Sequence, residues 1–327
     1  MLTARQNLLE TIKGGNPDRF VNQYEFMELI VEIPLAGAPI APGEEGKDVW
    51  GVTKKWYEGQ PGQFPVHGDG YTVLEDVTQW KEIIKMPSVD YPNEAWTAAI
   101  GHANSVNRNE KFVTATYFGG VFERLHYLMG MENALMSFYE EPEAMKELID
   151  FITEYELAYA KETIKRIKPD ALFHHDDWGT QKSTFLSPEM FSEFIAPAYK
   201  KIYGYWKENG VEVVVHHADC YAATLVPSMI DMGIDIWQGC MTTNNVPELV
   251  KKYGGKISFM GDLDNGQLDK ADWTVEEVVE HVKRACTSSG TLYYIPSMIM
   301  GGPDSIYPGL YDAVSAEIDK MSKVVFK

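Results

Sequence analysis

Side chains of the types that catalyse reactions and bind metals stand at the ends of four apolar, β-branched segments. The segments cover residues 171–179, 211–220, 233–240 and 256–265, and each turns polar at its end. A polar side chain in a buried strand needs a partner or a function. One histidine or aspartate at a strand end often only caps a loop, but four successive cases indicate an active-site face. The residues are His174, His175, Asp176, Asp177 and Trp178; His216, His217, Asp219 and Cys220; Gln238 and Cys240; and Asp262, Asp264 and Asn265.

The second of these segments carries a compact set of potential zinc ligands. Side chains alternate along a strand, so only one histidine of the pair 216–217 faces inward at this level. That histidine, Asp219 and Cys220 offer the imidazole, carboxylate and thiolate that zinc accepts, and a catalytic zinc site leaves one position open. Cys240 is a further candidate, although a small buried hydrophobic role is more common for such a cysteine. The sequence suggests this metal site without a CxxC or HExxH motif.

The elements that must position these residues alternate regularly in the second half of the chain. Apolar segments typical of strands cover the four ranges above and residues 290–298. Helical segments follow them over residues 188–209, 222–232, 246–253, 274–288 and 311–325. Ser187 before Pro188, and Thr274 with Glu277, are predicted helix N-caps. Five strand–helix units in a row predict a parallel sheet.

The first half of the chain is less regular. Strands are predicted over residues 21–28 and 111–119, and helices over 131–138 and 142–167. Between the two strands lies a long segment with a Pro/Gly-rich stretch at residues 59–73. An irregular segment of this length in a compact domain is typical of a lid or a substrate-binding excursion.

Together these elements predict an α/β fold in one domain over residues 1–327, a (β/α)8 TIM barrel with helical and loop additions at the N-terminus. In such a barrel the catalytic face is the carboxyl end of the strands, where the polar residues stand. An open, doubly wound sheet is the alternative, but no GxGxxG or GxxxxGK turn follows any strand.

Composition excludes several classes of function. The net charge of −19 argues against nucleic-acid binding, because phosphate contacts need lysine and arginine. Three cysteines are too few for a disulfide framework and fit a reducing compartment. No apolar run approaches the roughly 20 residues of a membrane helix, and the N-terminus lacks the features of a signal peptide. The cytoplasm is therefore the expected compartment. The sequence has no GxSxG motif, which argues against a serine hydrolase.

Several longer motifs resemble the uroporphyrinogen decarboxylase superfamily, and more closely its corrinoid-dependent methyltransferase branch. Residues 119–150 resemble the glycine–aromatic opening, the GMEN turn and the helix start of that family, and residues 176–202 resemble its SPExFxEFxxP element. The stretches DVWGV at 48–52 and FMGDLDN at 259–265 resemble its early and late segments. The resemblance spans nearly the whole chain and implies a (β/α)8 barrel.

The resemblance also implies a zinc site with altered ligands. The methyltransferases of the family bind zinc through an HxCG motif and a cysteine near the last strand. Aligned on Pro227, the stretch HADCYAATLVP places His217 on the family histidine, Asp219 on the first cysteine and Cys220 on the glycine. Near the last strand, Ser297 and Met298 stand where a cysteine is expected. The implied ligands are therefore His217 and Cys220, with Asp219 as a ligand or as a partner of one.

The activity implied by the resemblance is O-demethylation, in which a methyl group moves between a small methylated substrate, such as an aryl methyl ether, and a corrinoid protein. Zinc on the ether oxygen would act as a Lewis acid, or His175 or Asp177 would act as the acid. The pocket residues expected are Glu123, Arg124, His174, Trp178 and Asp262. The implied partners are the corrinoid protein and the substrate. The oligomeric state is left open, and a homodimer is one possibility.

Two other classes of function stay open. A lyase that decarboxylates a carboxylated cyclic substrate without metal needs cationic pocket residues, and Arg124 is the only arginine at a suggestive position. The arginine-rich N-terminal signature of the tetrapyrrole decarboxylases is missing, which argues against porphyrinogen decarboxylation. A non-catalytic binding protein would use the same pocket and would show ligand binding without turnover.

Overall fold

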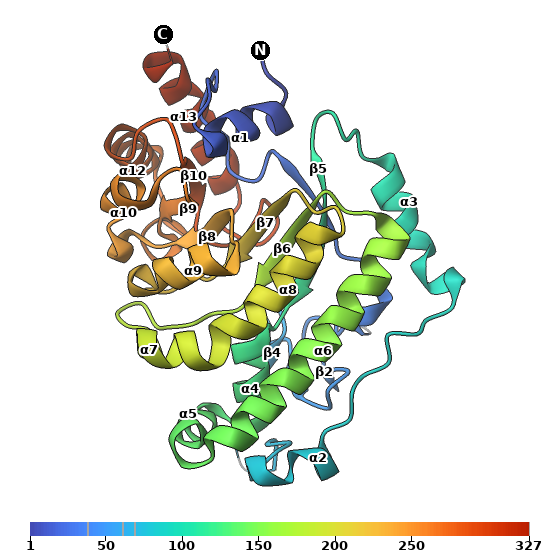
Figure 1. The fold of residues 1–327 in the computed structure, drawn as a ribbon. Coiled ribbons are helices and arrows are strands. Elements are labelled where there is room, and N and C mark those ends of the chain that lie inside the picture. Colours follow the sequence, from blue (N-terminus) through green and yellow to red (C-terminus); the bar gives the residue numbers. More distant parts are fainter. Residues whose placement is uncertain (38, 61, 69, 327) are drawn as a thin grey trace.

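A computed structural model describes residues 1–327 except 38, 61, 69 and 327, and its centre is a parallel sheet of seven strands (Figure 1). The strand order is β1-β5-β6-β7-β8-β9-β10, and all neighbouring strands are parallel. The strands are β1 (Met27–Ile30), β5 (Phe112–Phe118), β6 (Ala171–His175), β7 (Val213–His217), β8 (Ile236–Cys240), β9 (Ser258–Leu263) and β10 (Tyr294–Met298). The predicted α/β class with a parallel sheet is thereby confirmed.

The sheet curls so that the segment before β1 approaches its other edge. The backbone N–H of Met298, at the end of β10, donates to Oε1 of Gln23 over 3.4 Å. The described strands therefore form a curled seven-stranded sheet, and an eighth strand of this sheet is not among them. The predicted strand over 21–28 begins only at Met27, because the positive φ of 51° at Gln23 and a turn at Tyr24 interrupt an extended backbone.

Helices cover the outer face of the sheet, as the sequence periodicity predicts (Figure 1). The helices of the described residues are α1 (Ala4–Lys13), α2 (Trp80–Ile83), α3 (Thr97–Ser105), α4 (Val121–Met129), α5 (Met131–Glu140), α6 (Pro142–Ile167), α7 (Pro188–Met190), α8 (Ala196–Glu208), α9 (Val226–Met232), α10 (Val246–Tyr253), α11 (Asn265–Leu268), α12 (Val275–Ser288) and α13 (Leu310–Val325). Short 3₁₀ turns cover Pro34–Ala36, Val77–Gln79, Asn93–Trp96, Ala223–Leu225 and Thr242–Asn244. Within the described residues, none of these helices has the length and apolar character to cross a bilayer.

The predicted N-caps are confirmed, and one predicted helix is interrupted. The side chain of Ser187 accepts from the backbone N–H of Met190, and Thr274 and Glu277 form a reciprocal capping box. The helix predicted over 188–209 contains one π-helical turn, Phe191–Ile195, between α7 and α8. Pro197 lies just after this turn and has no N–H for a regular helical hydrogen bond, which accounts for the local change in pitch.

Two hydrophobic clusters separate the inner face of the sheet from its outer face. The inner cluster takes alternate residues of successive strands, such as Ala171 and Phe173 of β6 and Val213 and Val215 of β7, and Leu8 of α1 packs against it. The residues between them, such as Leu172 and Val214, belong to the larger cluster under the helices. The alternation expected for strands therefore decides which side chains point into the curled sheet.

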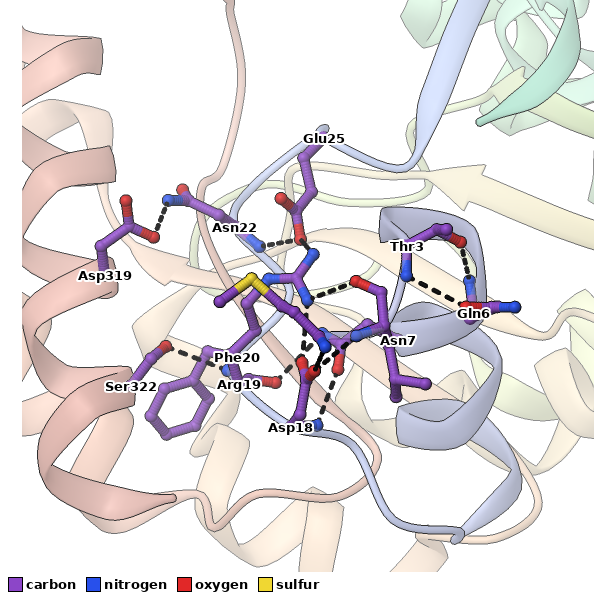
Figure 2. A network of polar contacts seen from close by, with 12 residues as sticks. Thr3, Gln6, Asn7, Asp18, Arg19, Phe20, Asn22, Glu25, Asp319 and Ser322 are labelled. Atoms are coloured by element: carbon purple, nitrogen blue, oxygen red, sulfur yellow. Dashed lines mark hydrogen bonds and ion pairs between the residues drawn. The ribbon is translucent and has the colours of Figure 1, made fainter. Parts of the chain in front are cut away.

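The N-terminal segment closes the amino-terminal side of the sheet through polar contacts (Figure 2). Asn7 of α1 donates to the carbonyl of Arg19 and accepts from the N–H of Asp18, at 3.1 and 3.0 Å. The N–H of Phe20 donates to Ser322 of α13. These contacts hold α1, the following turn and α13 together, and they leave the opposite, carboxyl-terminal side of the strands for a site.

The irregular segment of the first half folds into a small antiparallel sheet beside α4 (Figure 1). Its strands are β2 (Glu45–Lys47), β3 (Thr53–Lys55) and β4 (Phe64–Pro65). Asp48, between β2 and β3, accepts from Nη1 of Arg124 over 2.7 Å, and the Arg124 guanidinium lies over the ring of Trp50. The small sheet and its loops, called the excursion below, are thereby attached to the first turn of α4, next to the carboxyl ends of the strands.

Candidate active site at the carboxyl ends of the strands

One row of inward-facing side chains crosses four neighbouring strands at the same level. Phe118 pairs in register with His175, His175 with His217, and His217 with Gln238. His175, His217 and Gln238 each lie two residues beyond a member of the inner hydrophobic cluster, so each points into the curled sheet. Phe118 lies on the same face of β5 as Phe112 of that cluster. The sheet therefore changes from apolar to polar within a single layer, at the end where catalytic groups stand in such folds.

The row contains a group that can hold a metal ion. Among the described residues, His175, Asp177 and His217 each offer one potential ligand atom, and these three atoms lie within 4.8 Å of one another. The two imidazole rings stack with their centroids 4.4 Å apart. Two imidazoles and a carboxylate are a donor set that zinc and other divalent metals accept.

Both histidines of the group are oriented through their Nδ1 atoms. Nδ1 of His175 lies 2.9 Å from Oε2 of Glu123, and Nδ1 of His217 is hydrogen bonded to Oε1 of Gln238. The Gln238 amide donates from Nε2 to the Tyr24 hydroxyl and to the Ile299 carbonyl, so its oxygen is the atom that faces His217. Both Nδ1 atoms therefore act as donors, and Nε2 is the atom of each ring that can bind a metal once it carries no proton, as in metal sites whose histidines have orienting partners.

The charges around the two histidines differ strongly. Burial lowers the pKa of His175, but the adjacent Glu123 carboxylate outweighs this and raises it to about 10. Burial likewise raises the pKa of Glu123, but the charge and hydrogen bond of His175 outweigh this and lower it to about 2. Burial and the neighbouring His175 charge lower the pKa of His217 to about 4. Without a metal the site therefore holds an imidazolium–carboxylate pair beside a neutral imidazole.

Two carboxyl groups stand above the histidines. The backbone N–H of Asp219 donates to Oδ1 of Asp177 over 2.9 Å, which brings the ends of β6 and β7 together. Burial raises the pKa of Asp177, and burial with the Asp177 charge raises that of Asp219 to about 6. The Asp219 carboxyl can therefore hold a proton close to neutral pH, beside the potential metal ligands.

Asp176 lies between His175 and Asp177 in the chain but points to the outer face. Its carboxylate accepts from the backbone N–H groups of Phe122 and Glu123 over 2.9 and 2.7 Å, and from Nε1 of Trp178 and the Tyr199 hydroxyl. A carboxylate at a helix N-terminus satisfies free N–H groups and interacts favourably with the helix dipole. Asp176 thus fixes the first turn of α4, from which Glu123 reaches His175.

The comparison with known proteins bears on this arrangement. A sequence model described as uroporphyrinogen decarboxylase (URO-D) matches residues 63–298, well over half of the chain. The chain belongs to the uroporphyrinogen decarboxylase family. Over 170 residues it is 26% identical to the uroporphyrinogen decarboxylase of Aquifex aeolicus (strain VF5), a match that covers 49% of this chain and 47% of the relative. The chain thus spans about half the length of the curated relative it matches.

A solved structure is similar over the full length. The methyltransferase from Methanosarcina mazei superposes with a TM-score of 0.66 at 13% sequence identity, covering 98% of this chain and 99% of that one. At this identity the likeness shows a shared fold. This member of the uroporphyrinogen decarboxylase family therefore has the same overall architecture as a methyltransferase, including the segments outside the 63–298 match.

The structure brings five of the sequence-predicted site residues together. Glu123, His175, Asp177, His217 and Asp219 lie in one continuous set of contacts at the ends of β6 and β7. The resemblance selected His217 over His216, and the register places His217 on the inner face.

Three predicted pocket residues lie on the outer face or in ion pairs with other elements. Nε2 of His174 contacts Glu156 of α6 over 2.8 Å, and Trp178 stacks on His216 at 3.9 Å. Arg124 is committed to Asp48 of the excursion. These contacts position elements around the site, so a direct role of the three residues in substrate binding stays a prediction.

Asp262 and Cys220 lie outside the group of potential metal ligands. A register shift between β8 and β9 and the positive φ of 69° at Asp262 turn that carboxylate toward Arg284 of α12, at 2.7 Å. Cys220 is 1% exposed, and burial raises the pKa of its thiol well above the usual value. It lies beyond the end of β7 and belongs to the larger hydrophobic cluster under the helices. Its role as a ligand stays a prediction.

Gln238 is among the polar strand-end residues of the sequence but has no predicted role of its own there, and Phe118 and Tyr24 are not singled out. A usable signal was the repeat HHDD at 174–177 and HHAD at 216–219, which places the same HHxD pattern at the ends of two neighbouring strands. Two such patterns in register put two inner histidines side by side and two aspartates above them. The orienting partners Glu123 and Gln238 lie far from the repeat in the sequence. Glu123 is among the expected pocket residues, but no spacing links either partner to its histidine.

Proposed function

We propose that this member of the uroporphyrinogen decarboxylase family is a methyltransferase that moves a methyl group between a small methylated substrate, an aryl methyl ether, and a corrinoid protein. The observation that carries the proposal is the pair of inner histidines, both oriented through Nδ1, with a carboxylate beside them. The full-length likeness in fold to a methyltransferase supports it.

The residues fit a zinc ion, which is part of the proposal. Nε2 of His175, Nε2 of His217 and a carboxylate oxygen of Asp177 would hold it, and Asp219 stands beside them. Three protein ligands with one open position are typical of catalytic zinc. When bound, zinc would act as a Lewis acid on the oxygen that loses the methyl group. Cys220 remains the alternative ligand that the resemblance implies.

The chain's own residues orient the reaction and supply a proton. The methyl–oxygen bond breaks, its electron pair stays on the oxygen, and the methyl group passes to the reduced corrinoid of the partner. The oxygen then takes a proton, which the Asp219 carboxyl can hold near neutral pH because burial raises its pKa to about 6. Glu123 and Gln238 keep both imidazole rings in place throughout.

The same proposal includes a closed (β/α)8 barrel. Its support is the position of residues 20–24, which lie between the two edges of the described sheet: Gln23 bonds to the end of β10, and Tyr24 accepts from Gln238 of β8.

A decarboxylase-like lyase is the second candidate, favoured by the 26% identity to a uroporphyrinogen decarboxylase. It would act on a carboxylated cyclic substrate without metal. Against it, Arg124 is committed to Asp48 and is not free to hold a substrate carboxylate.

Direct assays separate the two. The zinc-loaded protein is mixed with reduced corrinoid protein and a panel of methoxyarenes, and methylation of cobalt is followed by its absorption change. We expect transfer that disappears on treatment with a chelator. No absorption change across the panel, together with carbon dioxide release from a carboxylated substrate in the presence of chelator, would establish the lyase instead.

A further inference from the structure

Phe118 is an exposed aromatic side chain at the mouth of the site, by which we mean the side of the site at the carboxyl ends of β5, β6, β7 and β8. It is the last residue of β5, and its side chain is 53% exposed although the six residues before it in the strand are buried. Burial of a phenylalanine ring is favourable, so a ring left open at the end of a buried strand offers apolar area to a ligand. It stands in the row of the two inner histidines, in register with His175.

The surroundings of Phe118 give the mouth one apolar flank and one polar flank. Its ring centroid lies 6.0 Å from that of His175 and 6.2 Å from that of Phe173, which lies one layer deeper. At the other end of the row stand the Gln238 amide and the Tyr24 hydroxyl. The potential metal ligands lie between the two flanks. A ligand that spans the row would place an apolar part on Phe118 and a polar atom at the histidines.

We propose that Phe118 is a specificity-determining residue that holds the aromatic ring of the methyl donor, with the ether oxygen directed to His175 and His217. This inference rests on the proposed function and deepens it, because it assigns the choice of aromatic over aliphatic ethers to one side chain. Aromatic rings pair in offset or edge-to-face arrangements with centroids about 4.5–7 Å apart, and such pairs gain more than their area alone. An aliphatic ring of equal size gains the area only.

Ligand binding without any corrinoid protein tests this. The probe is 4-fluoroanisole, titrated into zinc-loaded protein and followed by fluorine NMR, with anisole and cyclohexyl methyl ether as unlabelled competitors of similar size. We expect wild-type protein to bind anisole more tightly than cyclohexyl methyl ether. In Phe118→Leu the Kd of 4-fluoroanisole should rise about three- to tenfold, whereas that of cyclohexyl methyl ether should change by less than about twofold.

Two further variants make the result specific. Phe118→Tyr keeps the ring and should retain the preference for anisole. Tyr139→Leu removes an exposed ring, 74% exposed, near the end of α5 and should leave both Kd values unchanged. Thermal unfolding of each variant shows that the fold is retained. Equal binding of the two ethers by wild-type protein, or an anisole preference that survives in Phe118→Leu, would overturn the inference.

The inference and the proposed function fail separately. If the anisole preference depends on Phe118 but no methyl group reaches the corrinoid, the inference holds and the proposed reaction is wrong. If methyl transfer occurs and its kcat/KM for aromatic against aliphatic ethers is the same in wild type and Phe118→Leu, the reaction holds and the inference is wrong.

Discussion

Strands β6 and β7 each end in two histidines, and the histidines on the inner face of the sheet have different contacts from those on the outer face. On the inner face, His175 and His217 have Nδ1 partners and present Nε2 toward the mouth. On the outer face, His174 contacts Glu156, and His216 is held by the Tyr203 hydroxyl and by the Trp178 ring. The same residue type, one position apart, therefore serves a candidate site on one face and helix packing on the other.

The difference lies mainly in the partners and not in the residue type. The two outer histidines are completely buried and His217 is 5% exposed, whereas the side chain of His175 is 25% exposed. The outer imidazoles lie against the aromatic rings of Tyr199 and Tyr203 of α8, and the carboxylate that His174 contacts belongs to α6. Burial lowers the pKa of His216 well below its usual value, whereas Glu123 raises that of His175. We therefore expect inner substitutions to remove function and outer ones to remove stability.

The largest effect is expected for His217→Ala. Loss of one of three ligands should lower zinc affinity by more than about a hundredfold and abolish methyl transfer, with a small change in the free energy of unfolding. Zinc content after dialysis and urea unfolding measure the two. Cys220→Ser is the control, and it should keep its zinc. Zinc retained in His217→Ala but lost in Cys220→Ser would show that the ligands implied by the sequence resemblance, rather than the inner histidines, hold the metal.

On the outer face, His174→Ala should destabilise the protein by about 3–5 kcal/mol, because it leaves Glu156 buried without its partner. Urea unfolding of the metal-free protein gives this number. The double variant with Glu156→Leu should recover part of the loss, since it removes the unpaired carboxylate. If the folded fraction of His174→Ala lost its zinc while its stability stayed at the wild-type level, the division between the two faces would be refuted.

Glu123→Gln tests the orienting contact on the inner face. An amide oxygen can still accept from Nδ1 of His175 but carries no charge, so we expect the zinc affinity of the site with His175 deprotonated, that is, corrected for proton competition, to fall about 10- to 100-fold with the fold intact. Titration with a competing chelator measures this. Glu143→Gln, on the exposed start of α6, serves as the charge-matched control. An unchanged zinc Kd in Glu123→Gln would remove Glu123 from the site.

Zinc binding should weaken as the pH falls. The pKa of His175 is about 10 in the metal-free protein, so this ring must lose a proton before Nε2 can bind a metal. Between about pH 9 and 7 the affinity should fall about tenfold per pH unit. In Glu123→Gln the pKa of His175 moves down, so the slope should flatten in this range. Chelator competition measures the zinc Kd of both proteins across the pH range. A pH-independent affinity in wild type would contradict the assignment of His175 as a ligand.

The smallest effect is expected for Tyr203→Phe. It removes the hydroxyl that contacts Nδ1 of His216 on the outer face and should cost about 1 kcal/mol of stability. Zinc affinity and methyl transfer should stay at the wild-type level. A change in zinc affinity with unchanged stability would mean that the outer histidines are coupled to the site after all.

Much of the fold could be predicted from the sequence because its signals are local. The helix over 142–167 agrees with α6 at both ends, and the caps at Ser187 and Thr274 follow from side chains within three residues of the helix start. The start of β1 could not be predicted, since the turn at Gln23 depends on contacts with β10 and α13. Closure of a sheet depends on such distant contacts.

The candidate site could be predicted in part for the same reason. Strand ends and alternation place one histidine of the pair 216–217 on the inner face, and the family resemblance selects His217. Neither identifies its orienting partner Gln238 on the next strand. The direction of Asp262 could not be predicted, because the register shift before it and its positive φ break the alternation. Phe118 looks like a core residue in the sequence, and only its exposure in the fold sets it apart.

The tripeptide His175–Asp176–Asp177 has a consequence for protein engineering. Its first and third residues, His175 and Asp177, face the mouth. Its middle residue, Asp176, holds the first turn of α4, which carries Glu123. A graft of only the inner histidines and aspartates onto another scaffold would lose the residue that orients His175. The smallest transplantable unit therefore includes the end of β6 together with the first turn of α4, and a designer who moves one has to move both.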